Sequence, residues 1–326
     1  MITNNEENIK YLNALKVVRT LGKVNKNSKV LFLSDADTEV NKKYLISALK
    51  QTNASFKHIQ IKGAKTHGAE MDSKIANEMK SVDLVIGLTK SNITHTKARK
   101  DAQAKGVHII ALPESHENNF FLANGWKCDF KKIKPKIDKL AKALTKANRA
   151  RVYSYDGTDI EMSIKNRNGR AITGFSNSKD ISAGYCLEAS LAPVEGTANG
   201  RIVVNTSVPG VCLIKKRNIE ITIKDGFAIN ITGGEEAKIF KNLLKKFNDS
   251  KVYNLGELGI GMNPECTIDG TMCSDESVYG AIQLALGTSF YIGGTIKAAA
   301  HYDTIVTNAN LELDGKLILR NKDLLI

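Results

Sequence analysis

The stretch KVLFL at residues 29–33 decides the fold of the first half of the chain. A short apolar run bounded by polar residues is typical of a buried strand. Similar runs alternate with helical patterns farther along: runs at 57–61, 83–88 and 107–112, and helical patterns at 41–51, 71–79 and 96–105. Strands joined by helical crossovers form a parallel sheet covered by helices. An amphipathic helix is expected upstream, over Glu6–Leu21. We therefore predict a doubly wound α/β domain over residues 1–148.

The character of the sequence changes after Arg149. Asp-Gly pairs at 156–157, 225–226 and 314–315 each lie between runs rich in β-branched and aromatic residues, which is a strong hairpin signal. Helical patterns interrupt these runs at Glu235–Phe247 and Asp275–Leu286. We predict that residues 149–326 form a mainly antiparallel β domain of the α+β class, and we assign the metal site discussed below to it.

Composition and charge exclude several classes of protein. The chain has 326 residues, of which 42% are hydrophobic and 25% charged, as in a folded chain of two domains. Its apolar runs are far shorter than the roughly 18 residues of a membrane span, and the first residues do not resemble a signal peptide, so we expect a cytoplasmic protein without membrane contact.

The net charge of +13 raises the question of nucleic acid. The densest run of lysines, at residues 131–151, would wrap around several faces of a helix, and no nucleic-acid-binding motif accompanies it. We therefore expect no nucleic-acid partner. Exposed sheet edges in the second half favour a homodimer.

His301 and Asp303 are the most informative residues for function. On a strand, positions i and i+2 project from one face, so an imidazole and a carboxylate can reach the same metal ion. The alternative is a hydrogen-bonded pair at a sheet edge. Glu257 in LGELGIG and Glu188 in GYCLEA are acids among small and apolar neighbours, where burial requires a cation or a hydrogen-bond partner. The sequence best supports a metal site of Glu257, His301 and Asp303.

A second candidate is the string THTKAR at residues 94–99. It follows a predicted strand and opens a predicted helix. Thr94 or Thr96 is expected to cap that helix, whose first backbone amides favour an anion. The alternative is a capping threonine beside an exposed histidine.

Several of these motifs resemble the aminopeptidase S/T family of metallopeptidases. The resemblance rests on four stretches: LGE at 255–257, LALG at 284–287, His301-x-Asp303, and EASLAPVEGTANG at 188–200. The last has the form found in the shorter branch of the family, which includes 2,5-dihydroxypyridine 5,6-dioxygenase, an iron-dependent ring-cleaving enzyme. THTKAR is also similar to this branch. The resemblance implies a catalytic role for His95 and substrate-binding roles for Thr94, Thr96 and Arg99.

The two chemistries of the family imply different metal ligands. The peptidase pattern implies ligands at Glu188, Glu257, His301 and Asp303, and a histidine where this chain has Gln283. A neutral amide is a poor ligand, which weakens a two-metal site, so we place Gln283 among the substrate-binding residues. The iron branch implies two histidines and one carboxylate. His301 and Asp303 match two of these, and Glu257 takes the place of the second histidine.

From these residues we expect a metal-dependent hydrolase of the aminopeptidase type, acting on an amide or peptide-like bond of a small molecule or short peptide. One or two divalent ions (Zn, Mn, Co or Fe(II)) would polarise the carbonyl, and Glu188 would act as general base. Two alternatives stay open: a mononuclear non-haem Fe(II) dioxygenase that cleaves a hydroxylated pyridine or aromatic ring, and a catalytically silent binding protein with the same fold.

Overall fold

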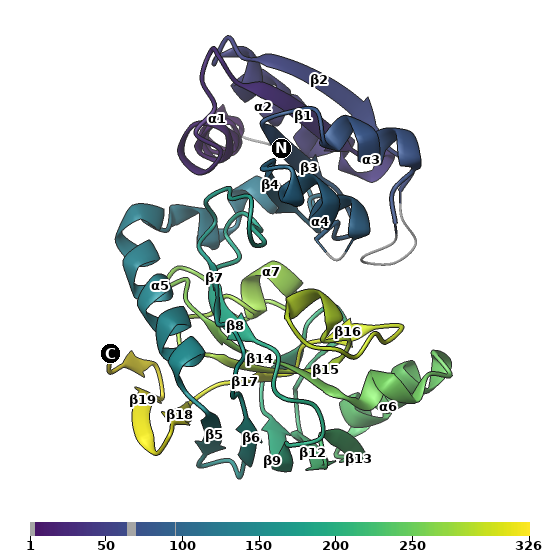
Figure 1. Cartoon of the computed structure of the whole chain (residues 1–326), viewed down its shortest axis with the longest axis vertical. Helices are drawn as coiled ribbons and strands as arrows, with labels where there is room; N and C mark the ends of the chain where they lie inside the picture. The colour runs from purple at the N-terminus through teal and green to yellow at the C-terminus, as the bar shows by residue number, and fades with distance from the viewer. Residues whose placement is uncertain (1–3, 64–69, 95) are drawn as a thin grey trace. The chain divides into compact units, whose positions relative to one another are not determined.

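The computed structural model describes residues 4–63, 70–94 and 96–326, which pack as two compact units (Figure 1). The first unit comprises Met1–Phe130 and Ile172–Cys186, and the second comprises Lys131–Ala171 and Leu187–Ile326. The division into a domain of residues 1–148 and a domain of residues 149–326 stays a prediction.

A parallel sheet with the strand order β2-β1-β3-β4 forms the centre of the first unit. Its strands are β1 (Lys29–Ser34), β2 (Ser55–Gln60), β3 (Leu84–Leu88) and β4 (His108–Leu112). Its helices are α1 (Asn4–Leu15), which continues as a π-helical turn (Lys16–Leu21), α2 (Glu39–Lys50), α3 (Ser73–Met79) and α4 (Lys97–Ala104). The predicted parallel α/β fold of this half is confirmed.

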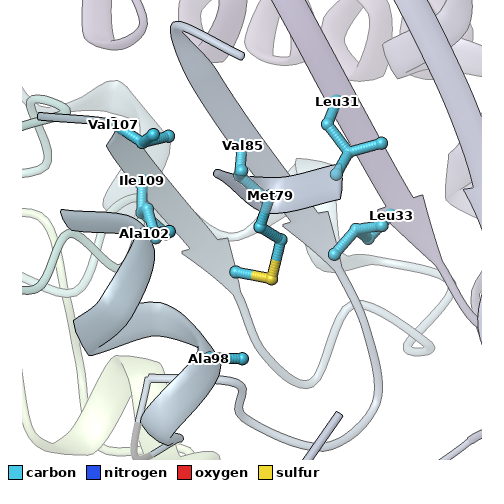
Figure 2. Packing of buried hydrophobic residues seen from close by; sticks show 8 residues of the cluster. All are labelled: Leu31, Leu33, Met79, Val85, Ala98, Ala102, Val107 and Ile109. Carbon is cyan, nitrogen blue, oxygen red and sulfur yellow. The ribbon is translucent and has the colours of Figure 1, made fainter. Parts of the chain in front are cut away.

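Side chains that alternate along the strands bury against α3 and α4. Figure 2 shows this cluster, which consists of buried residues from the sheet, from the two helices and from the position before β4: Leu31, Leu33, Met79, Val85, Ala98, Ala102, Val107 and Ile109. Full burial of a leucine or valine side chain contributes about 1.5–3 kcal/mol, so the apolar runs hold the helices on the sheet.

The second unit contains two antiparallel sheets. We name the first the site sheet; its strand order is β11-β10-β17-β15-β14-β8-β7, with β16 paired to β15. Its strands are β7 (Arg170–Ile172), β8 (Glu188–Leu191), β10 (Ser207–Val208), β11 (Cys212–Leu213), β14 (Leu255–Gly261), β15 (Ile282–Gly287), β16 (His301–Tyr302) and β17 (Ile305–Val306).

The other sheet, which we name the outer sheet, has the strand order β13-β12-β9-β6-β5-β18-β19-β20. Its strands are β5 (Arg149–Ser154), β6 (Asp159–Ser163), β9 (Asn199–Val204), β12 (Ile219–Lys224), β13 (Phe227–Thr232), β18 (Ala309–Leu313), β19 (Lys316–Arg320) and β20 (Asp323–Leu324). The predicted Asp-Gly hairpins join β5 to β6, β12 to β13 and β18 to β19. Asp225 (φ 47°) and Gly226 (φ 78°) both have positive φ, which explains the residue choice.

Three further helices and several short turns complete the two units. The helices are α5 (Phe130–Lys146), α6 (Glu235–Lys246) and α7 (Met272–Asp275). Single 3-10 turns lie at Ala36–Thr38, Phe120–Leu122, Asn124–Lys127, Ser250–Tyr253 and Phe290–Ile292. Within the described ranges, no helix is long and apolar enough to cross a membrane.

The helix predicted over Asp275–Leu286 is wrong. Helix α7 ends at Asp275, and Ile282–Gly287 forms β15 in the middle of the site sheet. Gly280, with φ 78°, lies between them and interrupts any helix. Apolar residues at 282, 284 and 286 follow the period of two that a strand requires.

Candidate metal centre

One face of the site sheet carries polar side chains. In the strand register, Glu188 pairs with Gly261, Ser190 with Gly259, and Gly259 with Gln283. Directly paired residues of an antiparallel sheet project from the same face, so these residues share a face. Their neighbours on the other face are apolar, as in Leu258, Ile260 and Leu284, all fully buried. We call the face that carries Glu188, Ser190 and Gln283 the polar face.

Glu257 lies on the polar face because it alternates with Gly259 along β14, and a bulge turns Leu255 to the apolar face. Leu255 pairs with Leu286 and Glu257 with Ala285, so Gly256 is the extra residue of β14. Without this bulge, Leu255 and Glu257 would project to the same side. Gly256 lies tightly against β15, because a Cβ added there would be 2.9 Å from the Gly287 carbonyl oxygen.

Glu257, His301 and Asp303 lie together. Each offers a ligand atom, and these atoms all lie within 4.8 Å of one another. His301 Nε2 is 3.0 Å from Glu257 Oε2 and 3.6 Å from Asp303 Oδ2. The Thr288 carbonyl oxygen lies 2.9 Å from His301 Nδ1, which therefore donates to it and leaves Nε2 to face the carboxylates. This arrangement could hold a metal ion.

Further polar side chains border this group. Ser190 Oγ donates to Glu188 Oε1 at 3.1 Å, and the Gln283 amide hydrogen-bonds Glu188 as well as the carbonyl of Glu276. Arg170, on β7, is 9% exposed, and its Nη1 lies 3.9 Å from Glu257 Oε1. Sequence reasoning missed Arg170, because a basic residue on a short strand carries no specific signal.

The shared burial shifts the pKa values of the acids in opposite directions. Burial and the charge of Glu257 raise the pKa of Glu188 to about 8. Burial alone would raise the pKa of Glu257, but the hydrogen bond from His301 and the charges of His301 and Arg170 lower it to about 2. Burial opposes the charged form of His301, yet Asp303 and Glu257 raise its pKa to about 9. Burial also raises the pKa of Asp303. A divalent cation would replace the protons that this cluster holds.

The first-unit candidates form a network of their own. Thr96 caps α4 by accepting a hydrogen bond from the Arg99 amide at 3.2 Å, and Thr94 is buried. The Arg99 guanidinium is also buried; its Nε donates to the Thr94 carbonyl at 2.6 Å and its Nη1 to Gln103 Oε1 at 2.6 Å. His95 lies outside the described residues. The structure thus joins Thr94, Thr96 and Arg99 to one another within the first unit.

Comparisons with known proteins agree with one branch of the resemblance. A sequence model described as NicX, 2,5-dihydroxypyridine 5,6-dioxygenase, matches residues 10–325. The 2,5-dihydroxypyridine 5,6-dioxygenase of Pseudomonas putida KT2440 is 30% identical to this chain over a segment that spans 39% of the chain and 39% of that relative's length.

Two solved structures share the fold. The 2,5-dihydroxypyridine dioxygenase from Pseudomonas putida KT2440 superposes over 97% of this chain and 96% of its own, with a TM-score of 0.82 and 20% identity. Wild-type AmpT from Thermus thermophilus superposes over 98% of this chain and 100% of its own, with a TM-score of 0.70 and 12% identity.

Proposed function

The chain belongs to the family of 2,5-dihydroxypyridine 5,6-dioxygenases, and from this premise we propose that it is a mononuclear iron(II) dioxygenase that opens the ring of a dihydroxylated pyridine. The family match over residues 10–325 is the observation that carries the proposal. The expected aminopeptidase-type hydrolase is wrong, because both the family match and the curated relative are ring-cleaving oxygenases. AmpT shares the fold at 12% identity and lends no support to hydrolysis.

The donor set of the second unit fits iron(II). Glu257, His301 and Asp303 would hold the ion, with two carboxylates and one imidazole. Asp303 Oδ1 is buried and has no hydrogen-bond partner within the described part of the chain, a costly state that a cation would relieve. When bound, iron(II) would supply open coordination positions for the ring diol and for oxygen.

The charge of the site supports a single ion. This chain has Glu257 where the resemblance implies a second histidine, so the set carries one more negative charge than two histidines and a carboxylate. Arg170 lies 3.9 Å from Glu257 and balances that charge. Gln283 stands at the position of the peptidases' further histidine. In place of an imidazole it has a neutral amide, which hydrogen-bonds Glu188. These contacts favour one ion over two.

The residues around the ligands would handle protons and orientation. In the metal-free protein, burial and the charge of Glu257 raise the pKa of Glu188 to about 8, and we propose Glu188 as the group that exchanges a proton with a ring hydroxyl of the substrate. Ser190 and Gln283 fix the direction of its carboxyl group. In the first unit, we propose His95 as an acid/base residue, and Thr94, Thr96 and Arg99 as substrate-binding residues; these roles rest on the family resemblance of THTKAR.

The test is oxygen uptake by protein that was purified without air and loaded with iron(II), with 2,5-dihydroxypyridine as substrate. We expect consumption of oxygen with loss of the ring absorbance, and a decrease of about 100-fold or more in His301→Ala. Tyr302→Phe is the matched control, because Tyr302 lies between the two candidate ligands but packs against Phe240 and Phe247. Unchanged turnover in His301→Ala, or equal turnover with zinc, would refute the proposal.

A further inference from the structure

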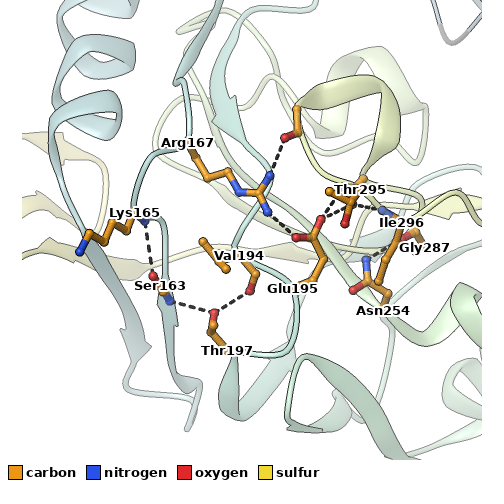
Figure 3. A network of polar contacts seen from close by, with 12 residues as sticks. Ser163, Lys165, Arg167, Val194, Glu195, Thr197, Asn254, Gly287, Thr295 and Ile296 are labelled. Atoms are coloured by element: carbon orange, nitrogen blue, oxygen red, sulfur yellow. Dashed lines mark hydrogen bonds and ion pairs between the residues drawn. The ribbon is translucent and has the colours of Figure 1, made fainter.

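Glu195 joins a half-buried arginine, Arg167, to the loop of residues 288–296. It belongs to the acidic segment of residues 188–200 but lies outside the metal group. Its Oε1 accepts hydrogen bonds from the Thr295 amide at 2.6 Å and from Ser289 Oγ at 3.1 Å. Its Oε2 pairs with Arg167 Nη2, as Figure 3 shows. The Arg167 and Glu195 side chains are only 14% and 18% exposed, which strengthens this charged contact.

Arg167 also holds the loop directly. Its Nη1 donates to the Gly293 carbonyl at 2.6 Å. Gly293 has φ 103°, and a Cβ added to Gly294 would lie 2.2 Å from Ser289 Oγ and 2.7 Å from Glu195 Oε1. The loop backbone therefore passes tightly over the carboxylate. Arg167 and Glu195 act on it as one unit.

The same loop holds the imidazole of His301. Ser289 Oγ accepts from the Ile296 amide at 3.2 Å, and the Ile296 carbonyl accepts from Ser289 N at 2.9 Å and from Thr288 Oγ1 at 3.1 Å. The Thr288 carbonyl in turn accepts from His301 Nδ1 at 2.9 Å. Hydrogen bonds, linked through the covalent bonds of Ile296 and Thr288, thus connect Arg167 and Glu195 with the imidazole.

We propose that Glu195, paired with Arg167, is a positioning residue that fixes the His301 ring for metal binding. The inference rests on the proposed function, because it takes His301 as a ligand. The carbonyl of Thr288 selects the tautomer with a free Nε2 and sets the ring plane, and Glu195 sets the position of that carbonyl. Partners of this kind change metal affinity by about 10–100-fold when removed. The Ala299 amide, between this loop and His301, donates a further hydrogen bond to Asp249 Oδ2 at 2.8 Å.

The experiment is a titration of metal-free, full-length protein with cobalt(II), followed by its visible absorption, which reports the coordination of the ion. We expect Glu195→Ala to weaken cobalt binding about 10-fold or more and to change the spectrum. Glu195→Gln keeps an oxygen acceptor for Thr295 and Ser289 but loses the acceptor for Arg167, so its cobalt affinity should lie between those of Glu195→Ala and the wild type. Asp314→Ala is the control: it removes another carboxylate that accepts two backbone amides, those of Asn148 and Arg149, in the outer sheet. Its cobalt affinity should equal that of the wild type.

The outcomes separate this inference from the proposed function. Wild-type cobalt affinity and spectrum in Glu195→Ala, with a lowered melting temperature, would mean that Glu195 is merely structural and would overturn the inference. Loss of cobalt binding in His301→Ala would still support the metal site. Wild-type binding in His301→Ala would instead refute the metal site itself. If Glu195→Ala does not fold, Arg167→Met tests the same step by releasing both Glu195 and the Gly293 carbonyl. Unchanged cobalt affinity in Arg167→Met would overturn the inference.

Discussion

Glu188 and Glu257 show how neighbouring acids on one sheet face acquire different protonation states. Both are buried, at 6% and 5% exposure. His301 lies 3.0 Å from Glu257 and stabilises its charged form, whereas Glu188 faces the negative charge of Glu257. The pKa of Glu257 is therefore lowered to about 2 and that of Glu188 raised to about 8. Two acids whose pKa values are driven apart can serve as a ligand and as a proton carrier.

These shifts predict how the stability of the metal-free protein depends on pH. The pKa of Glu188 rises from 4.5 to about 8 on folding, and that of His301 from 6.5 to about 9. The folded state therefore binds more protons than the unfolded state, and its stability decreases as the pH rises from about 5 to 9. The pKa of Glu257 is lowered from 4.5, so its contribution to stability is lost only as the pH falls below 4.5, outside this window. We expect the melting temperature of chelator-treated protein to fall by about 5 °C or more over this window.

Glu188→Gln provides the check on that pH dependence. The amide resembles the protonated acid, so the fall in melting temperature should become shallower. Glu161→Gln, a change of an exposed carboxylate on the outer sheet, should leave the slope unchanged. A melting temperature that rises toward pH 9, or an equal slope in Glu188→Gln, would contradict the assignment.

At the scale of elements, the glycines of β14 make room for the polar face. Gly259 lies between Ser190 and Gln283, and Gly261 lies opposite Glu188. A Cβ at Gly259 would be 2.5 Å from Gln283 Oε1, the mobile end of a side chain. A Cβ at Gly261 would be 2.3 Å from the Val278 carbonyl oxygen, which belongs to the backbone. The same substitution should therefore have different consequences at the two positions.

We expect Gly261→Ala to lower the free energy of unfolding by about 1–3 kcal/mol, the cost of overpacking a site that cannot shift. Gly259→Ala should cost less than about 1 kcal/mol. However, it displaces the Gln283 amide that hydrogen-bonds Glu188, so it should decrease turnover. Urea denaturation of the metal-free variants gives the stabilities, and oxygen uptake gives the activity. Equal destabilisation by both alanines would show that Gln283 is as fixed as the backbone.

Elements with a strong local signal were predictable from the sequence. The strands at 29–33 and 83–88, and the three Asp-Gly hairpins, are formed by local patterns that the tertiary structure does not oppose. The helix predicted over Asp275–Leu286 is wrong because residues 282–287 form β15, which pairs on both sides within the site sheet. Pairing between strands distant in sequence decides such a segment, and a local pattern cannot reveal it.

At the scale of the whole molecule, the site residues with a local sequence signal were predictable, and those held by contacts distant in sequence were not. The i, i+2 spacing indicated His301 and Asp303, and a carboxylate among glycines indicated Glu257. Arg170 and the hydrogen-bond chain through Glu195 could not be predicted, because strands and loops far apart in the sequence make those contacts. The chemistry could not be predicted either: a histidine and two carboxylates suit hydrolysis and oxygenation alike. The family match over most of the chain is what favours oxygenation in the proposed function.

A final prediction concerns the folding of the chain as a whole. The candidate ligands lie on β14 and at residues 301–303, segments separated by more than forty positions, so the unfolded chain does not hold them together. An ion that binds only the folded state adds RT ln(1 + [L]/Kd) to its stability, about 2.7 kcal/mol when its concentration is a hundred times Kd. Iron(II) or cobalt(II) should therefore raise the melting temperature of the wild type and of Tyr302→Phe by about 5 °C or more, and leave His301→Ala unshifted. An equal shift in His301→Ala would mean that the ion binds elsewhere on the protein, and would refute the metal site of Glu257, His301 and Asp303.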